Sequence, residues 1–194
     1  MTPESVSREQ PRHQEVRRAI LDAAWALARQ QGLGAWSLRD VGAAVGMRAP
    51  SLYVYFPNKA AIYDAMFAMG YQALLTRIEN TPRTGPPRRI IRRAAHLFFD
   101  FCVEDPARYQ LLFLRTLPGF EPSPQSMALA EMVLTEGTRA LAAAGAGRPD
   151  AVDLWTALMS GLVSQQVSND PGGRRWKRLI DRSVDMFLAS QASG

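Results

Sequence analysis

Apolar residues recur at steps of three and four in the first part of the chain. Within residues 14–31 the apolar positions include Val16, Ile20, Ala23 and Leu27. This spacing places them on one helical face, which predicts an amphipathic helix that ends near Gly32. Residues 1–12 lack such spacing, and we expect them to form a flexible N-terminal arm.

Two short helices are predicted next by their end signals. Ser37 and Asp40 have the spacing of a capping box, in which each side chain accepts from the other residue's backbone N–H. Gly46 ends that helix, Pro50 suits the first turn of another, and Pro57 ends the second one. Two short helices joined by a tight turn predict a helix-turn-helix, whose second helix can enter the major groove of DNA.

The rest of the chain reads as further helices separated by joints that contain Gly or Pro. Asn58 can cap a long helix, and Asp105 followed by Pro106 starts a short one. The expected helices cover residues 59–80, 88–104, 106–115, 126–144, 150–168 and 173–190. No long segment alternates with the period of a strand, so we expect an all-α protein of about nine helices. We divide it into a three-helix DNA-binding domain at 13–58 and a ligand-binding and dimerisation domain at 59–194.

Composition excludes several classes of protein. Hydrophobic residues make up 47% and charged residues 21%, an ordinary globular balance. Cys102 is the single cysteine and cannot form an internal disulfide, which favours the reducing cytoplasm. The uncharged run at 154–169 is too short and too polar to span a membrane, and the first ten residues lack the apolar core of a signal peptide. With His13 and His96 as the only histidines, we expect no zinc site, no other metal and no cofactor.

Charge and side-chain chemistry point to duplex DNA as a partner. The formal net charge is +5, and nearly all of the basic residues are arginine. Arg39 and Arg48 can make bidentate contacts to guanine or phosphate, and Lys59 at a helix start can reach a phosphate. The full predicted DNA-contacting set is Ser37, Arg39, Arg48, Ala49, Pro50, Ser51, Tyr53, Val54, Tyr55 and Lys59. The alternatives are a solvated surface role for Arg39 and a core-packing role for one of the two tyrosines.

Residues 37–59, with the sequence SLRDVGAAVGMRAPSLYVYFPNK, closely resemble the DNA-binding signature of TetR-family transcriptional regulators. The L-Y-x-Y-F-x-N-K ending is the most specific part of the resemblance. Gly42 departs from the alanine usual in the family, and Val54 stands where a polar residue is frequent. The resemblance implies a homodimer with a small-molecule pocket in the C-terminal helices. It also implies that ligand binding there moves the fourth helix and changes the separation of the two recognition helices.

Apolar residues of the C-terminal part are candidates for that pocket and for a dimer interface. The predicted pocket residues are Met66, Phe67, Phe98, Phe101, Phe113, Met127, Trp155 and Met159, because adaptable methionines and aromatic rings suit apolar ligands. The predicted interface residues are Leu158, Leu162, Ile180, Val184 and Phe187, from two helices that are apolar on more than one face. The alternative for each residue is an ordinary packed core within one chain.

The sequence therefore predicts a cytoplasmic, dimeric, DNA-binding transcriptional regulator. We interpret it as a repressor that an unidentified, mostly apolar small molecule releases from a pseudo-palindromic operator. An activator of the same family, or a helical ligand-binding protein without DNA function, is the alternative. No catalytic motif is recognisable, so we expect no enzyme, and we expect no association with membranes.

Overall fold

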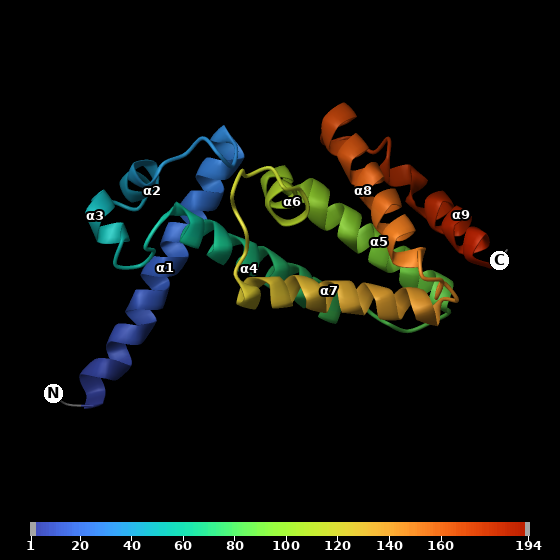
Figure 1. The fold of residues 1–194 in the computed structure, drawn as a ribbon, viewed down its shortest axis with the longest axis horizontal. Helices are drawn as coiled ribbons and strands as arrows, with labels where there is room; N and C mark the ends of the chain where they lie inside the picture. Colours follow the sequence, from blue (N-terminus) through green and yellow to red (C-terminus); the bar gives the residue numbers. More distant parts are fainter. Residues whose placement is uncertain (1–2, 193–194) are drawn as a thin grey trace.

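The all-α prediction is confirmed by a computed structural model, which describes the backbone of residues 3–192 and the side chains of 11–48 and 50–192 (Figure 1). Nine α-helices and one short 3₁₀ segment, η1, make up the described part, and it contains no strand. The helices are α1 Pro3–Gln31, α2 Leu38–Ala44, α3 Ala49–Leu52, α4 Lys59–Glu79, α5 Pro87–Glu104, α6 Pro106–Phe113, α7 Pro124–Ala143, α8 Ala151–Asn169 and α9 Ile180–Ala192, with η1 at Lys177–Leu179.

Helix α1 begins earlier than the sequence pattern suggests. The structure makes it helical from Pro3 onwards, so residues 3–12, predicted to be a flexible arm, continue the helix; residues 1–2 lie outside the described part. Residues 3–12 are rich in Glu, Gln and Arg, which are good helix formers. Extending an existing helix costs far less than starting one, so this segment can be helical without an apolar face of its own.

The second helix of the helix-turn-helix is shorter than predicted. Helix α3 ends at Leu52, and residues 53–55 continue as turns before Phe56. Phe56 and Leu52 are both buried, and the backbone N–H of Phe56 donates to the Leu52 carbonyl over 2.9 Å. The segment predicted as one helix up to Pro57 is therefore a single helical turn followed by a compact turn.

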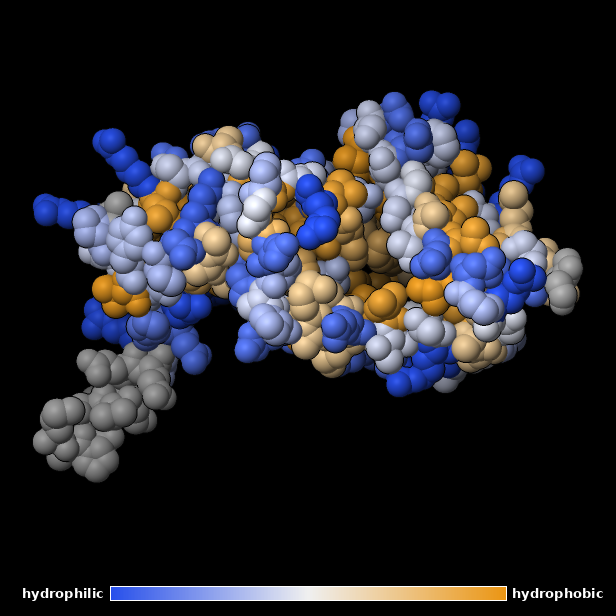
Figure 2. All heavy atoms as spheres, viewed as in Figure 1, coloured by the Kyte–Doolittle hydropathy of each residue, from blue (hydrophilic) through white to orange (hydrophobic). Residues whose placement is uncertain are grey.

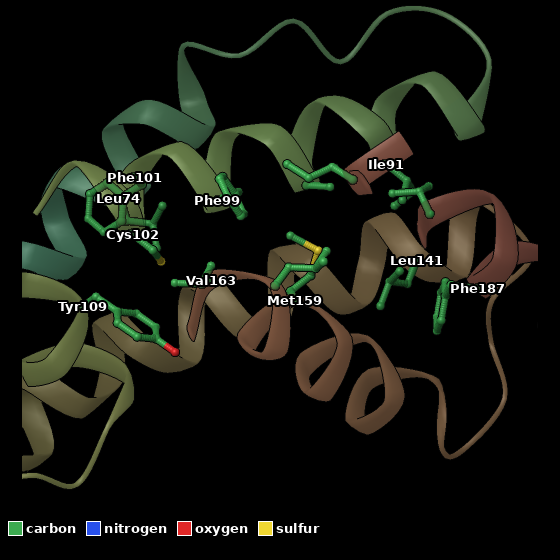
Figure 3. Close-up of a cluster of buried hydrophobic side chains, with 14 of the residues drawn as sticks. Leu74, Ile91, Phe99, Phe101, Cys102, Tyr109, Leu141, Met159, Val163 and Phe187 are labelled. Carbon is green, nitrogen blue, oxygen red and sulfur yellow. The ribbon is translucent and has the colours of Figure 1, made fainter. Parts of the chain in front are cut away.

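Two hydrophobic cores share helix α4. The N-terminal core joins α1, α2 and α3 to the first half of α4, which contributes Ile62 and Met66, and it also includes Ala107 and Leu111 of α6. The C-terminal core joins the second half of α4 to α5–α9, and Phe67 and Leu74 belong to it. Figure 3 shows the C-terminal core, where side chains from α5, α8 and α9 point toward one another. One continuous helix therefore connects the helix-turn-helix to the C-terminal domain.

Polar and apolar residues are unevenly spread over the surface. Figure 2 shows blue hydrophilic residues over much of the helix-turn-helix end, and orange apolar residues gathered around the C-terminal helices. Among the described residues, no helix is both long enough and apolar enough to cross a membrane.

Candidate nucleic-acid interface and ligand cavity

The start of α2 is fixed by the predicted capping box. The backbone N–H of Asp40 donates to Ser37 Oγ over 3.2 Å, and the backbone N–H of Ser37 donates to Asp40 Oδ2 over 2.8 Å. The hydrogen bonds from Ser37, first its hydroxyl and then its backbone N–H, lower the pKa of the Asp40 carboxyl. Because the Ser37 hydroxyl also donates to Asp40 Oδ2, it is engaged in capping, a role that competes with the DNA contact predicted for it.

Most of the other predicted DNA-contacting side chains lie on one exposed surface of α2, α3 and the turn after α3. Arg39, Arg48, Pro50, Ser51, Tyr53 and Val54 are all exposed or partly exposed, Tyr53 at 55% and Val54 at 73%. Within the described part of the chain, the side chains of Arg39 and Arg48 form no hydrogen bond or ion pair. The contact predicted for Ala49 lies outside the described side chains. This surface presents two available guanidinium groups, hydroxyl groups and an apolar side chain.

Tyr55 is held against α1 by contacts that the sequence did not suggest. Its ring centroid lies 4.7 Å from that of His13, and its backbone carbonyl accepts a hydrogen bond from Arg17 Nη1. The guanidinium carbon of Arg17 also lies 4.1 Å from the centroid of the Phe56 ring. Arg17 and His13 therefore fix the turn after α3 on the side of α1, and Tyr55 is half-buried there. In the sequence, the only indication of this role is that His13 and Arg17 lie four residues apart, about one helical turn, near the start of the apolar pattern of α1.

Lys59 does not project toward the exposed surface as predicted. Its ammonium donates to the carbonyl oxygens of Gly34, over 3.1 Å, and of Trp36. It also lies 4.3 Å from the centroid of the Trp36 ring. Desolvation by partial burial lowers the pKa of Lys59, partly offset by the charge of Asp40. Lys59 thus holds the loop between α1 and α2, a role that competes with the phosphate contact predicted for it.

A cavity of about 270 Å³, partly open to solvent, lies beside the second half of α4 and is bordered by α6, α7 and the 114–122 segment. Its lining residues are Phe67, Tyr71, Leu111, Leu112, Phe113, Leu114, Arg115, Thr116, Leu117, Phe120, Pro122, Met127 and Ala130. Three residues of the predicted pocket set, Phe67, Phe113 and Met127, are among them. The lining is mostly apolar, which suits an apolar or amphipathic small molecule.

The other predicted pocket residues lie elsewhere. Met66 is fully buried in the N-terminal core, whereas Phe101 and Met159 are buried in the C-terminal core (Figure 3). Phe98 and Trp155 are partly buried against the C-terminal core and do not line the cavity. Spacing along a helix identifies an apolar face, but which part of that face borders a cavity depends on how closely the neighbouring helices approach.

Four of the five predicted interface residues belong to the chain's own core. Ile180, Val184 and Phe187 pack inward from α9, and Leu162 is buried on α8. They are covered within one chain, so their placement at a dimer interface is corrected, whereas Leu158 is half-exposed. The outward sides of these helices carry Leu154, exposed at 48%, and Met186, exposed at 63%, together with Ala157 and Gly161.

Two polar contacts tie the helices around the cavity to the N-terminal part of the molecule, one to α1 and one to the first half of α4. The carboxylate of Asp105, which caps α6, is almost fully buried. Its Oδ2 accepts two hydrogen bonds from the guanidinium of Arg29 on α1, over 2.7 and 2.9 Å. The Asp64 carboxylate on α4 accepts from the backbone N–H of Ser123, over 2.7 Å, at the start of α7. The helices that border the cavity are therefore bonded directly to α1 and α4.

Candidates for metal ligation are absent from the described residues, where no group of three or more His, Cys, Asp or Glu side chains is gathered closely enough to hold an ion. Cys102 is buried, and this burial raises the pKa of its thiol. It lies in the C-terminal core beside Phe101 and is no candidate for a reactive thiol.

A family model and a known protein each match part of the chain. The family model for bacterial regulatory proteins of the tetR family matches residues 20–66, which include α2, α3 and the start of α4. Over 105 residues the chain is 27% identical to the uncharacterized HTH-type transcriptional regulator YobS of Bacillus subtilis (strain 168). This alignment covers 54% of the chain and about half, 55%, of that relative.

Solved structures share the fold over nearly the whole chain. The putative regulatory protein SCO4313 has a TM-score of 0.77 at 20% identity, covering 93% of this chain and 98% of that one. A tetR-family transcriptional regulator from Streptomyces coelicolor has a TM-score of 0.72 at 24% identity, covering 93% and 83%. The fatty acid degradation regulator FadR from Bacillus halodurans has a TM-score of 0.70 at 14% identity, covering 89% and 94%. The match of the family model shows that residues 20–66 are of the tetR-family type, and the likenesses to solved structures show that the chain shares their all-α fold.

Proposed function

We propose that this protein is a sequence-specific DNA-binding transcriptional regulator that reads the major groove with α3 and the start of α2. The observation that carries the proposal is the exposed surface of these two helices. Arg39 and Arg48 project from a helix-turn-helix whose internal contacts leave both guanidinium groups available. Arginine forks bind guanine edges and phosphate oxygens bidentately, and a helix-turn-helix brings such side chains into the groove.

Charge supports the same partner. Residues 1–60 carry eight Arg and Lys against five Asp and Glu, so most of the net charge of the chain lies near the helix-turn-helix. Phosphate contacts made by such residues provide sequence-independent affinity that weakens steeply with salt. The exposed Val54 suits apolar contact with a thymine methyl group rather than a hydrogen bond to a base.

The proposed functional unit is a homodimer in the cytoplasm. Its interface would use the outward side of α8 and α9, where Leu154, Leu158 and Met186 flank the small residues Ala157 and Gly161. Small residues allow two helices to approach closely, and apolar residues around them supply the buried area. Two-fold symmetry then predicts a pseudo-palindromic operator with half-sites about one helical turn apart, or slightly more.

The cavity supports regulation by a small molecule. Phe67 and Tyr71 line it from the same helix that begins directly after the helix-turn-helix. A mostly apolar ligand that enlarges the cavity would displace this half of α4 and, through it, α3. We propose that the protein is a repressor whose DNA affinity falls when the ligand binds; an activator with the same ligand response is the alternative. TetR-family regulators are transcription factors, and no enzymatic activity is proposed.

The test measures binding of the full chain to DNA from the region upstream of its own gene, by fluorescence anisotropy over a range of salt concentrations. Arg39→Ala/Arg48→Ala should weaken binding at least about tenfold, because a bidentate base contact contributes roughly 1–3 kcal/mol. The salt slope should fall by about 0.9 for each phosphate that the variant no longer binds. The matched control, Arg89→Ala/Arg148→Ala, removes two exposed arginines from the C-terminal domain and should leave both quantities unchanged. Unchanged affinity and slope in the first variant would show that this surface does not read DNA.

A further inference from the structure

The connection between α8 and α9 is built around two fixed polar side chains. Gln166 is buried near the end of α8, and its Oε1 accepts from the backbone N–H groups of Trp176, over 3.0 Å, and Lys177, over 3.3 Å. The Asp170 carboxylate accepts from the backbone N–H of Arg175 over 2.7 Å. Gln166 Nε2 also donates to the Asp170 carbonyl, which closes the connection on itself. Residues 174–178 are therefore held in a defined conformation rather than on a loose loop.

This connection presents a concentration of positive charge to a hollow. The sequence at 174–178 is RRWKR, with four cationic side chains in five residues. The hollow has a volume of about 560 Å³ and lies between this segment and α5; its lining residues are His96, Arg174, Arg175, Lys177, Arg178 and Asp181. A concave space of this size can hold a small organic molecule.

Most of that positive charge is unpaired. Lys177 Nζ forms an ion pair with Asp100 over 2.7 Å, and Asp181 Oδ1 lies 2.9 Å from His96 Nε2. The side chains of Arg174, Arg175 and Arg178 form no ion pair with any residue that the structure describes. Asp100 and Asp181 thus already have partners, and the Asp170 carboxylate interacts with the charge of Arg175. The guanidinium groups of Arg174 and Arg178 remain available for an anion.

We propose that this hollow binds a small polyanion that presents phosphate or carboxylate groups. Planar guanidinium groups bind such groups through two parallel hydrogen bonds, and several of them around one space select a ligand with more than one negative charge. The 174–178 segment lies between α8 and α9, far from α2 and α3 (Figure 1), and the hollow shares no residue with the apolar cavity. It is on the same pair of helices as the proposed dimer interface, but none of its lining residues belongs to that interface. A small molecule fits a concave site better than the convex surface of duplex DNA does.

The geometry of the connection provides a test that leaves the charge unchanged. A Cβ atom added at Gly173 would lie 2.2–2.4 Å from the carboxylate of Asp170. That carboxylate cannot move aside freely, because it holds the backbone of Arg175. Gly173→Ala should therefore shift the connection and disperse the arginines without altering the net charge.

The experiment measures binding of two probes, inorganic tripolyphosphate and citrate, to the full chain by calorimetry and by the rise in thermal midpoint at matched ionic strength. We expect the wild-type protein to bind at least one probe. Arg174→Gln/Arg178→Gln should weaken that binding at least about tenfold, since charge-assisted hydrogen bonds are roughly twice as strong as neutral ones and the variant removes two sets of them. Gly173→Ala should weaken it as well. The charge-matched control, Arg89→Gln/Arg148→Gln, removes the same two positive charges elsewhere and should bind like the wild type.

Tripolyphosphate tests for a phosphate ligand, and citrate tests for a carboxylate ligand. Binding of either probe supports the proposal if the substitutions act as stated. Circular dichroism without ligand establishes that each variant folds, and Arg174→Gln or Arg178→Gln alone repeats the test with a smaller change. The proposal is overturned if neither probe binds the wild type, or if the control weakens binding as much as the site variant does. It is also overturned if the site variant changes only DNA affinity or only the mass of the assembly, because the arginines then contact DNA or a second copy of the chain.

Discussion

The Arg29–Asp105 ion pair between α1 and α6 offers a quantitative test of how the two halves of the molecule are joined. Asp105 has two roles that can be separated. Its Oδ1 accepts from the backbone N–H of Arg108, over 3.1 Å, and caps α6, whereas its Oδ2 accepts from Arg29. Asp105→Ala removes both roles. Asp105→Asn can keep the capping oxygen while it removes the negative charge.

The contacts set the expected magnitudes. Loss of an N-cap side chain costs about 1 kcal/mol. The side chain of Arg29 remains about half exposed, so we discount the ion pair for solvent screening to about 1 kcal/mol. Asp105→Ala should therefore lower the free energy of unfolding by about 2 kcal/mol and the thermal midpoint by about 4–8 °C. Asp105→Asn should cost only about half as much.

Urea unfolding of four proteins at one fixed protein concentration measures the coupling: the wild type, Arg29→Met, Asp105→Ala and the double variant. Arg29→Met should cost about 1–2 kcal/mol in the wild-type background, because it leaves a buried carboxylate without its cation. It should cost almost nothing once Asp105 is alanine, which gives a coupling energy of about 1–2 kcal/mol. The same cost in both backgrounds would refute the reasoning and show that the two halves do not depend on this pair.

The remaining predictions concern other parts of the fold. Lys59→Met should lower the free energy of unfolding by about 1 kcal/mol and leave the salt slope of DNA binding unchanged, because the ammonium bonds backbone carbonyls; a reduced slope would make it a phosphate contact. The lowered pKa of Asp40 means that its contribution to stability is present above its ordinary pKa of 3.8 and is lost as the pH falls through the lowered value. Asp40→Asn should therefore flatten the acid limb of a thermal-unfolding pH series, and an unaltered limb would contradict this. Cys102 should react with iodoacetamide only after unfolding, as mass spectrometry can establish, since burial raises the pKa of its thiol. Leu154→Glu should halve the mass measured by light scattering if α8 forms the dimer interface, whereas Leu134→Glu on α7, similarly exposed, should not.

The sequence predicts structure best where local backbone chemistry determines it. Ser37, Asn58 and Asp105 each accept from a backbone N–H at the helix start that their positions predict. Such caps act over three residues, so the sequence contains all the information needed to place them. The outward position of Arg39 and Arg48 follows from the same local reasoning.

The sequence does not reveal contacts that depend on distant segments. Lys59 lies beside the DNA-binding motif in sequence, but its partners are carbonyls 23 and 25 residues earlier in the chain. The apolar stripes of α8 and α9 indicate that these helices are buried on more than one side. They do not indicate that Val184 and Phe187 face inward while Leu154 and Met186 do not. The width of a stripe gives the amount of burial, and tertiary packing decides which neighbour provides it.

The division of helix α4 between two cores has a consequence for how the molecule unfolds. Met66 packs with α1–α3 and its neighbour Phe67 packs with the C-terminal helices, so the boundary between the two cores lies between adjacent residues of one helix. The smaller N-terminal core can open as a cooperative unit while the rest stays folded. Amide hydrogens in the first half of α4 would then exchange together with those of α1, and those in the second half would exchange with α5 and α8. The amides of this single helix would thus show two levels of protection from hydrogen exchange. The change from one level to the other would fall between Met66 and Phe67, where the helix passes from one core into the other.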